Sequence, residues 1–128
     1  MSIKHTWSTS VKNDAGANVI ADVDVLTATA EENFSIVVPA GTTGEVDLAI
    51  DVSQIVSFFV ESTVAVTLHT NTTPAGAQDF SLAAKKALGW NANDAVNANP
   101  LTTNVTKLYF VNSGASSATV VGGFLLDV

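Results

Sequence analysis

The stretch Glu45-Val46-Asp47-Leu48-Ala49-Ile50-Asp51 decides the fold class, because apolar and polar residues alternate along it. Val46, Leu48 and Ile50 fall on one face of an extended chain, and the acids and Ala49 fall on the other. This period of two predicts a half-buried β-strand with one wet face.

The same alternation occurs twice more. In residues 19–25 one face carries Val19, Ala21, Val23 and Val25, and Asp22 and Asp24 fall on the other face. In residues 64–69 the valines and Leu68 alternate with Ala65, Thr67 and His69. Both stretches predict half-buried strands whose apolar face is covered.

Continuous apolar runs predict further strands that are covered on both faces, either by the core alone or by the core and a partner. They lie at 34–38, 56–60, 108–111 and 120–126. Clusters of Gly, Pro, Asn and Ser separate them at the spacing of short strands, with one helical turn at 51–55 and a turn at 83–87. The sequence therefore predicts one all-β domain, residues 1–128, folded as an antiparallel β-sandwich of the jelly-roll kind with eight or nine strands.

Composition excludes several classes of protein. The 128 residues include no Cys and no Arg, and twelve acids against five Lys give a formal charge of −7. Without Cys there are no disulfides, Cys-zinc sites or thiol nucleophiles. A negative chain without Arg is a poor ligand for nucleic acid, whose phosphates need a basic patch. We expect no signal peptide and no membrane span, because the first residues lack an apolar region and no apolar run reaches 18 residues.

The charge is concentrated in one half of the chain. Residues 1–61 carry nine acids and two Lys, whereas residues 62–128 carry three of each and are rich in Thr, Ser, Asn and Ala. Interface cores are depleted in charge, so the neutral half is either an ordinary neutral surface or a surface covered by other proteins.

No motif predicts an enzyme or a cofactor site. His5 and His69 belong to no G-x-S-x-G or triad pattern. Asp22 and Asp24 share one strand face, and Glu45, Asp47 and Asp51 share another. Paired carboxylates can bind calcium or act as acid and base, but no EF-hand spacing is present, and alternating acids also occur on solvated strand faces. We therefore predict no catalytic residues, metal or cofactor.

Trp7 and Trp90 are the two tryptophans, and two interpretations stay open for them. Exposed indoles would suit a carbohydrate-binding module, whereas packed indoles would belong to the core or to an oligomer interface. Trp90 follows Leu88 at a spacing of two, which favours packing.

The second part of the chain resembles a family. Seven segments follow one another in the order Glu45–Asp51, Val66–Pro74, Phe80–Leu82, Leu88–Trp90, Asn99–Leu101, Asn104–Asn112 and an apolar strand up to Asp127. This order is similar to that in small β-sandwich proteins encoded beside the major capsid genes of tailed bacteriophages. Some of these are capsid decoration (cement) proteins. The resemblance covers about residues 34–128.

The resemblance implies a non-enzymatic virion protein, often a homotrimer, that binds the outside of an expanded capsid and bridges major capsid subunits. It would be made in the host cytoplasm, with no nucleic acid, membrane or small-molecule partner. Residues 1–12 would be either an N-terminal arm, with Ile3, His5 and Trp7 on one side, or an ordinary first strand. We expect the interface to include Ile3, His5, Trp7, Trp90, Asn99 and Pro100. The alternatives are a carbohydrate-binding or tail-fibre sandwich module, or another tail or head-completion protein.

Overall fold

The computed structural model describes residues 2–12, 14–16, 18–93 and 97–128, with backbone alone at 9–12, 18–22 and 24. The strands of this part are β1 (Ile3–Lys12), β2 (Asn18–Ala28), β3 (Ala30–Val38), β4 (Thr42–Ile50), β5 (Ile55–Ser62), β6 (Val66–Thr70), β7 (Asp79–Leu82), β8 (Leu88–Asn91), β9 (Val105–Asn112) and β10 (Ala118–Leu126). The predicted all-β class is confirmed. The strand count is higher than predicted, because β1 and β2 form a separate hairpin beside eight sandwich strands.

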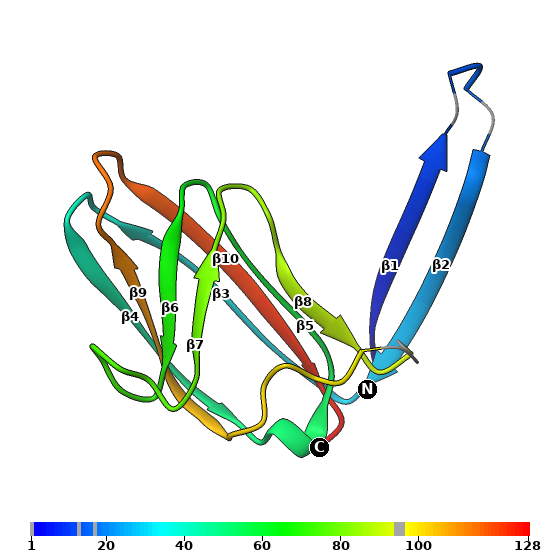
Figure 1. Ribbon diagram of the computed structural model, residues 1–128. Coiled ribbons are helices and arrows are strands. Elements are labelled where there is room, and N and C mark those ends of the chain that lie inside the picture. Colours follow the sequence, from blue (N-terminus) through cyan, green and yellow to red (C-terminus); the bar gives the residue numbers. More distant parts are fainter. Residues whose placement is uncertain (1, 13, 17, 94–96) are drawn as a thin grey trace.

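The sandwich has the strand order of a jelly roll (Figure 1). Its first strand pairs with its last and so on inward: β3 with β10, β4 with β9, β5 with β8 and β6 with β7, all antiparallel. This is one long hairpin rolled up into two sheets, as in double Greek-key sandwiches. We call β3-β10-β5-β8 the arm-side sheet and β4-β9-β6-β7 the far sheet.

The core lies between these sheets and follows the predicted alternation. Phe58 and Phe124 stack with ring centroids 5.6 Å apart, and Phe34 packs against Phe110 at 5.8 Å. The Phe34 ring has room because its neighbour on β10 is Gly122, where a Cβ atom would lie 2.4 Å from the ring. Gly122 is therefore a site where an aromatic ring approaches the strand backbone closely.

Polar groups close the ends of the sandwich. Buried Asn112 donates its side-chain amide to the carbonyls of Val38 (3.0 Å) and Ser116 (2.8 Å), and its side-chain oxygen accepts from Gly114 N–H at 3.1 Å. The predicted helical turn is a 3₁₀ helix, Val52–Gln54, and the predicted turn at 83–87 joins β7 to β8.

The hairpin β1–β2, which we call the arm, stands away from the sandwich (Figure 1). Its two strands pair antiparallel from Ile3 opposite Ala28 to Lys12 opposite Asn18. The chain passes from β2 into β3 within two residues, so the base of the arm is held against the sandwich. Among the described residues, no helix has the length and apolarity needed to cross a membrane.

Candidate assembly interface

The base of the arm sits on the outer face of the arm-side sheet. Leu26 and Ala28 of β2 are buried together with Leu125 of β10, which is 0% exposed. Ile3, Trp7 and Val56 pack around this cluster and are half-buried. We call these six residues the arm seat. It explains why 120–126 is apolar on both faces: Phe124 and Leu126 face the core, and Leu125 faces the arm.

His5 adds a polar link between the arm and the same sheet. Its Nδ1 lies 3.2 Å from the Oγ of Ser57 on β5, and its Nε2 lies 3.5 Å from Oε2 of Glu31 on β3. Ser57 is fully buried, so this contact gives its hydroxyl a partner. The ring thus ties β1 to two strands of the arm-side sheet, one on each side of Leu125.

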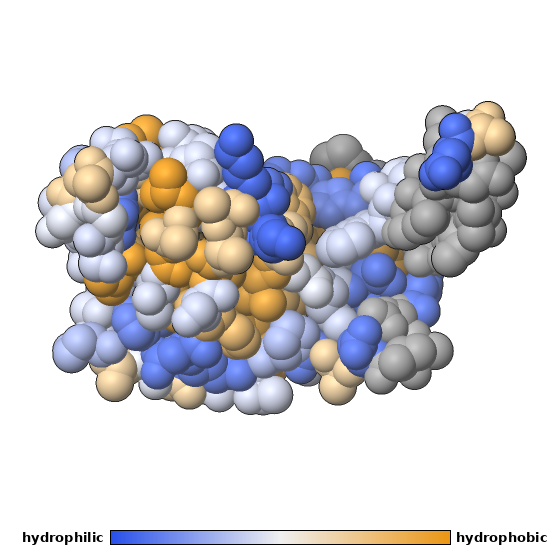
Figure 2. All heavy atoms as spheres, turned by 45° about the horizontal axis from the view of Figure 1, so that its top comes forward, coloured by the Kyte–Doolittle hydropathy of each residue, from blue (hydrophilic) through white to orange (hydrophobic). Residues whose placement is uncertain are grey.

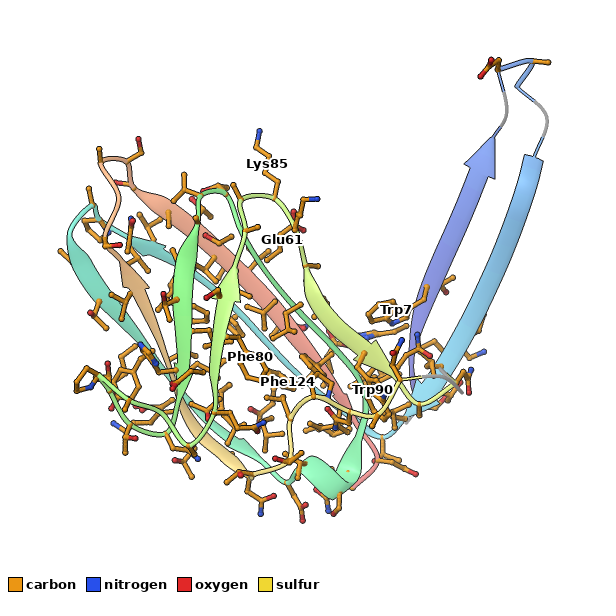
Figure 3. All side chains as sticks on the ribbon, in the orientation of Figure 1. Trp7, Glu61, Phe80, Lys85, Trp90 and Phe124 are labelled. Atoms are coloured by element: carbon orange, nitrogen blue, oxygen red, sulfur yellow. The ribbon has the colours of Figure 1, made fainter. Side chains whose placement is uncertain are left out.

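Trp7 spans the gap between the arm and the edge strand β8 (Figure 3). A Cβ atom on Gly89 would lie 2.9 Å from the tip of the Trp7 ring, so the absence of a side chain there lets the indole approach the strand. Beside it a groove of about 470 Å³ is lined by Lys4–Ser8, Phe59 and Ala87. Trp7 is therefore both a packed residue and one wall of a groove.

Further along β2 the apolar face is not covered. Val23 is 61% exposed and Val25 is 54% exposed. The prediction of a covered apolar face at 19–25 is therefore wrong for these two residues. Leu26 and Ala28 lie on the opposite face, which is the face that meets the sandwich, because side chains alternate along a strand. Val23 and Val25 therefore point away from the sandwich of the same chain.

A second apolar patch lies on the outer face of the arm-side sheet, beyond the arm seat. Val37 of β3 is 65% exposed and Val121 of β10 is 37% exposed. Their cross-strand partners are Thr119 and Ser35, which are also exposed and uncharged. We call these four residues the sheet patch.

The remaining predicted interface residues lie on β8 and in the loop that follows it. Trp90 is next to Gly89, which the Trp7 ring approaches, and Asn99 and Pro100 lie between β8 and β9. Trp90 on β8 is half-buried against the core and donates its indole N–H to the carbonyl of Asn97 at 3.0 Å, as the packing interpretation expects. Gln78 holds the following loop by donating to the Pro100 carbonyl at 2.7 Å, and the Asn99 side chain accepts from Leu101 N–H at 2.9 Å. These contacts explain the local structure, and a role for Trp90, Asn99 and Pro100 in an interface stays a prediction.

The candidate carboxylates have partners within the chain. Lys107 on β9 pairs with Glu45 and, at 3.3 Å, with Asp47, and these hydrogen bonds and charges raise the pKa of its ammonium group. Asp51 caps the 3₁₀ helix by accepting from the hydroxyl (2.6 Å) and N–H (2.9 Å) of Ser53, which lowers its pKa. The side chains of Asp22 and Asp24 are outside the described part.

His69 forms a hydrogen bond with Asp79 on the outer face of the far sheet. The two residues are directly opposite each other on β6 and β7, and Nδ1 lies 2.5 Å from Oδ1. The hydrogen bond from His69, followed by one from Gly76 N–H, lowers the pKa of Asp79. Within the described ranges, no group of three or more His, Asp or Glu is arranged to hold a metal ion.

The two sheets do not meet at the edge formed by β7 and β8. A shallow groove of about 240 Å³ lies there, lined by Phe80–Ala83 and Lys86–Leu88. Figure 2 shows apolar side chains reaching the surface on this side of the sandwich. Among the described strands, neither β7 nor β8 has a partner at its outer edge, which leaves backbone groups available for pairing.

Sequence reasoning missed the arm seat and the sheet patch. One signal was present: in β2 the apolar residues Val23 and Val25 are at odd positions, whereas Leu26 and Ala28 are at even positions. This change puts the apolar side chains of the two parts of the strand on opposite faces, so the sandwich can cover only one of the two pairs. Comparisons with family models, with curated proteins and with solved structures found no match.

Proposed function

We propose that this chain is a structural virion protein that binds the outside of an expanded bacteriophage capsid, as a homotrimer, and stabilises it by bridging major capsid subunits. The observation that carries the proposal is the arm: a projecting hairpin on a jelly roll, with Val23 and Val25 exposed on the face turned away from its own body. Exposed apolar patches on otherwise polar proteins mark contacts with other proteins. The resemblance of residues 34–128 to phage decoration proteins names the class of partner.

The mechanism is mass action. A protein that binds only the expanded shell stabilises that shell by its binding free energy, about 2.7 kcal/mol per site at a concentration about 100-fold above Kd. A trimer that contacts several capsid subunits at once gains avidity over any single contact. The unbound protein would be made in the host cytoplasm and would act after assembly.

The test is addition of the purified chain to capsids stripped of their decoration protein. We expect saturable binding to expanded shells, no binding to unexpanded ones, and a rise in the temperature at which shells release DNA. If neither binding nor thermal survival changes, the proposal fails. A heat-denatured sample of the same protein is the control for nonspecific adsorption.

One observation favours a second candidate, a carbohydrate-binding module. Trp7 and Phe59 form apolar walls of the groove beside the arm, and aromatic rings can stack on sugars. A glycan array would then show ligands whose binding is lost in Trp7→Ala. Binding should be kept in Trp90→Phe, the control, because the Trp90 ring packs against the core. An empty array would leave the structural function as the stronger candidate.

A further inference from the structure

We propose that the outer face of the arm docks on the sheet patch of a second copy of this chain, so that copies join head to tail into a closed ring. The inference deepens the proposed function, on which it rests for the idea that the chain acts as an oligomer. The juxtaposition that motivates it is an uncovered apolar face on the arm and an uncovered apolar patch on the sandwich of the same chain.

The arm cannot bury Val23 and Val25 against its own sandwich. Both lie on the face opposite Leu26, and it is the Leu26 face that meets Leu125. Swinging the arm closer to the sheet would bring down the same inner face and would leave the valines pointing outward. Valines on the outer face can therefore be covered only by another molecule.

The two surfaces match in chemistry. The outer arm face consists of Val23 and Val25 with their cross-strand partners Ser8 and Thr6, and the sheet patch consists of Val37 and Val121 with Thr119 and Ser35. Each therefore holds two valines and two hydroxyl side chains. All eight residues are exposed and uncharged, so the contact would leave no charge buried within it.

The two surfaces also match in spacing and in the charges beside them. Val23 and Val25 are two residues apart on one strand, about 7 Å. Val37 and Val121 are diagonal neighbours on adjacent strands, about 7–8 Å apart. Lys4 flanks the arm face, and Glu61, opposite Val121 on β5, flanks the patch. Opposite charges at the rim favour one orientation of the contact.

A contact between two different surfaces is heterologous, and such contacts form rings when the rotation between copies closes. In each copy the base of the arm covers Leu125 of its own arm-side sheet. The outer part of the arm would cover Val121 of the neighbouring copy, which lies four residues from Leu125 along β10, or about 13 Å. A two-stranded ribbon is marginal by itself, so this docking also supplies the support that the projecting part of the arm lacks.

The experiment uses sedimentation velocity on Val25→Asp, on Val37→Asp and on their mixture. We expect the wild type to be a ring, each variant to be a monomer with self-association weakened at least tenfold, and the mixture to form a 1:1 heterodimer. One intact arm and one intact patch remain in that mixture. The matched control is Val128→Asp, which puts the same charge at an exposed valine outside both surfaces and should leave the ring intact.

A cross-linking experiment does not depend on the folding of the acidic variants. Because the chain has no Cys, Val25→Cys and Val37→Cys introduce single thiols, and a short bis-maleimide should join the two variants to each other. A monomeric wild type at its highest workable concentration, full self-association of Val37→Asp, or links only between two Val25→Cys chains would overturn the inference. A ring that fails to bind shells would remove the proposed function alone. Shell binding by a monomer would remove this inference and the homotrimer, and would leave binding to the capsid in place.

Discussion

Replacing Leu125 by Ala should release the arm while the sandwich stays folded. Leu125 is fully buried, yet it belongs to the arm seat and not to the main core, which begins with its neighbours Phe124 and Leu126. Removing a buried Leu side chain down to Ala costs about 2–5 kcal/mol, through lost transfer free energy and the cavity left behind. Since the Leu125 side chain is buried together with Leu26 and Ala28 of the arm, this cost falls on the closed position of the arm.

The size of the effect follows from that cost. About 1.4 kcal/mol corresponds to a factor of ten in an equilibrium constant. The opening equilibrium of the arm should therefore rise by about 30-fold to several thousand-fold. The packing between the two sheets stays intact, so global unfolding should change much less than in Leu126→Ala, the matched control on the opposite face of the same strand.

Native-state hydrogen exchange with mass spectrometry measures both quantities at once. In Leu125→Ala, amides of residues 3–7 and 25–28 should exchange faster by the factor given above, whereas those of β9 in the far sheet should keep their wild-type rates. In Leu126→Ala, β9 should be affected as well. Equal acceleration of the arm and β9 in Leu125→Ala would refute the reasoning, because it would mean that arm and sandwich open as one unit.

Three further predictions concern the sandwich. Gly122→Ala should destabilise the fold by about 1–3 kcal/mol in denaturant unfolding, because its Cβ would lie 2.4 Å from Phe34; an unchanged midpoint would contradict the packing. Asn112→Ala should lower the free energy of unfolding by about 2–4 kcal/mol, because it leaves the backbone carbonyls of Val38 and Ser116 without the donor that the Asn112 amide provides. A decrease below about 1 kcal/mol would count against that role. Asp79 has a lowered pKa, so its stabilising effect is complete above about pH 4 and is lost as the pH falls through the lowered value. Asp79→Asn should therefore show a weaker loss of stability on acidification than the wild type, whereas His69→Gln, which keeps a donor, should lie between them.

Much of the fold is predictable because a strand with one wet face leaves a period of two in the sequence. Val46, Leu48 and Ile50 face the core as their alternation with acids indicates. In the apolar run at 120–126, Phe124 and Leu126 face the core and Leu125 is covered by the arm, whereas Val121 on the outer face is exposed. These features depend on local patterns, which a single sequence contains.

The candidate interface was less predictable, because periodicity defines two faces of a strand without saying which of them is covered. Val23 and Val25 alternate with acids as regularly as Val46 and Leu48 do, yet they are exposed. Only contact with the rest of the molecule distinguishes the two cases. Trp7 shows the same limit, since its position beside Gly89 depends on a meeting of strands that are far apart in the sequence.

The pairing of first strand with last has a consequence for the order in which the chain can fold during synthesis. β10 lies between β3 and β5, so the arm-side sheet has no continuous ladder until residue 126 has left the ribosome. Before that point β3 has no partner within its sheet, and the nearest pair along the sequence of the sandwich is β6 with β7. Folding dominated by such distant pairings is slow. Nascent chains should therefore expose their strand edges for most of translation, which makes the polysome, more than the finished protein, the place where this sequence is at risk of aggregation.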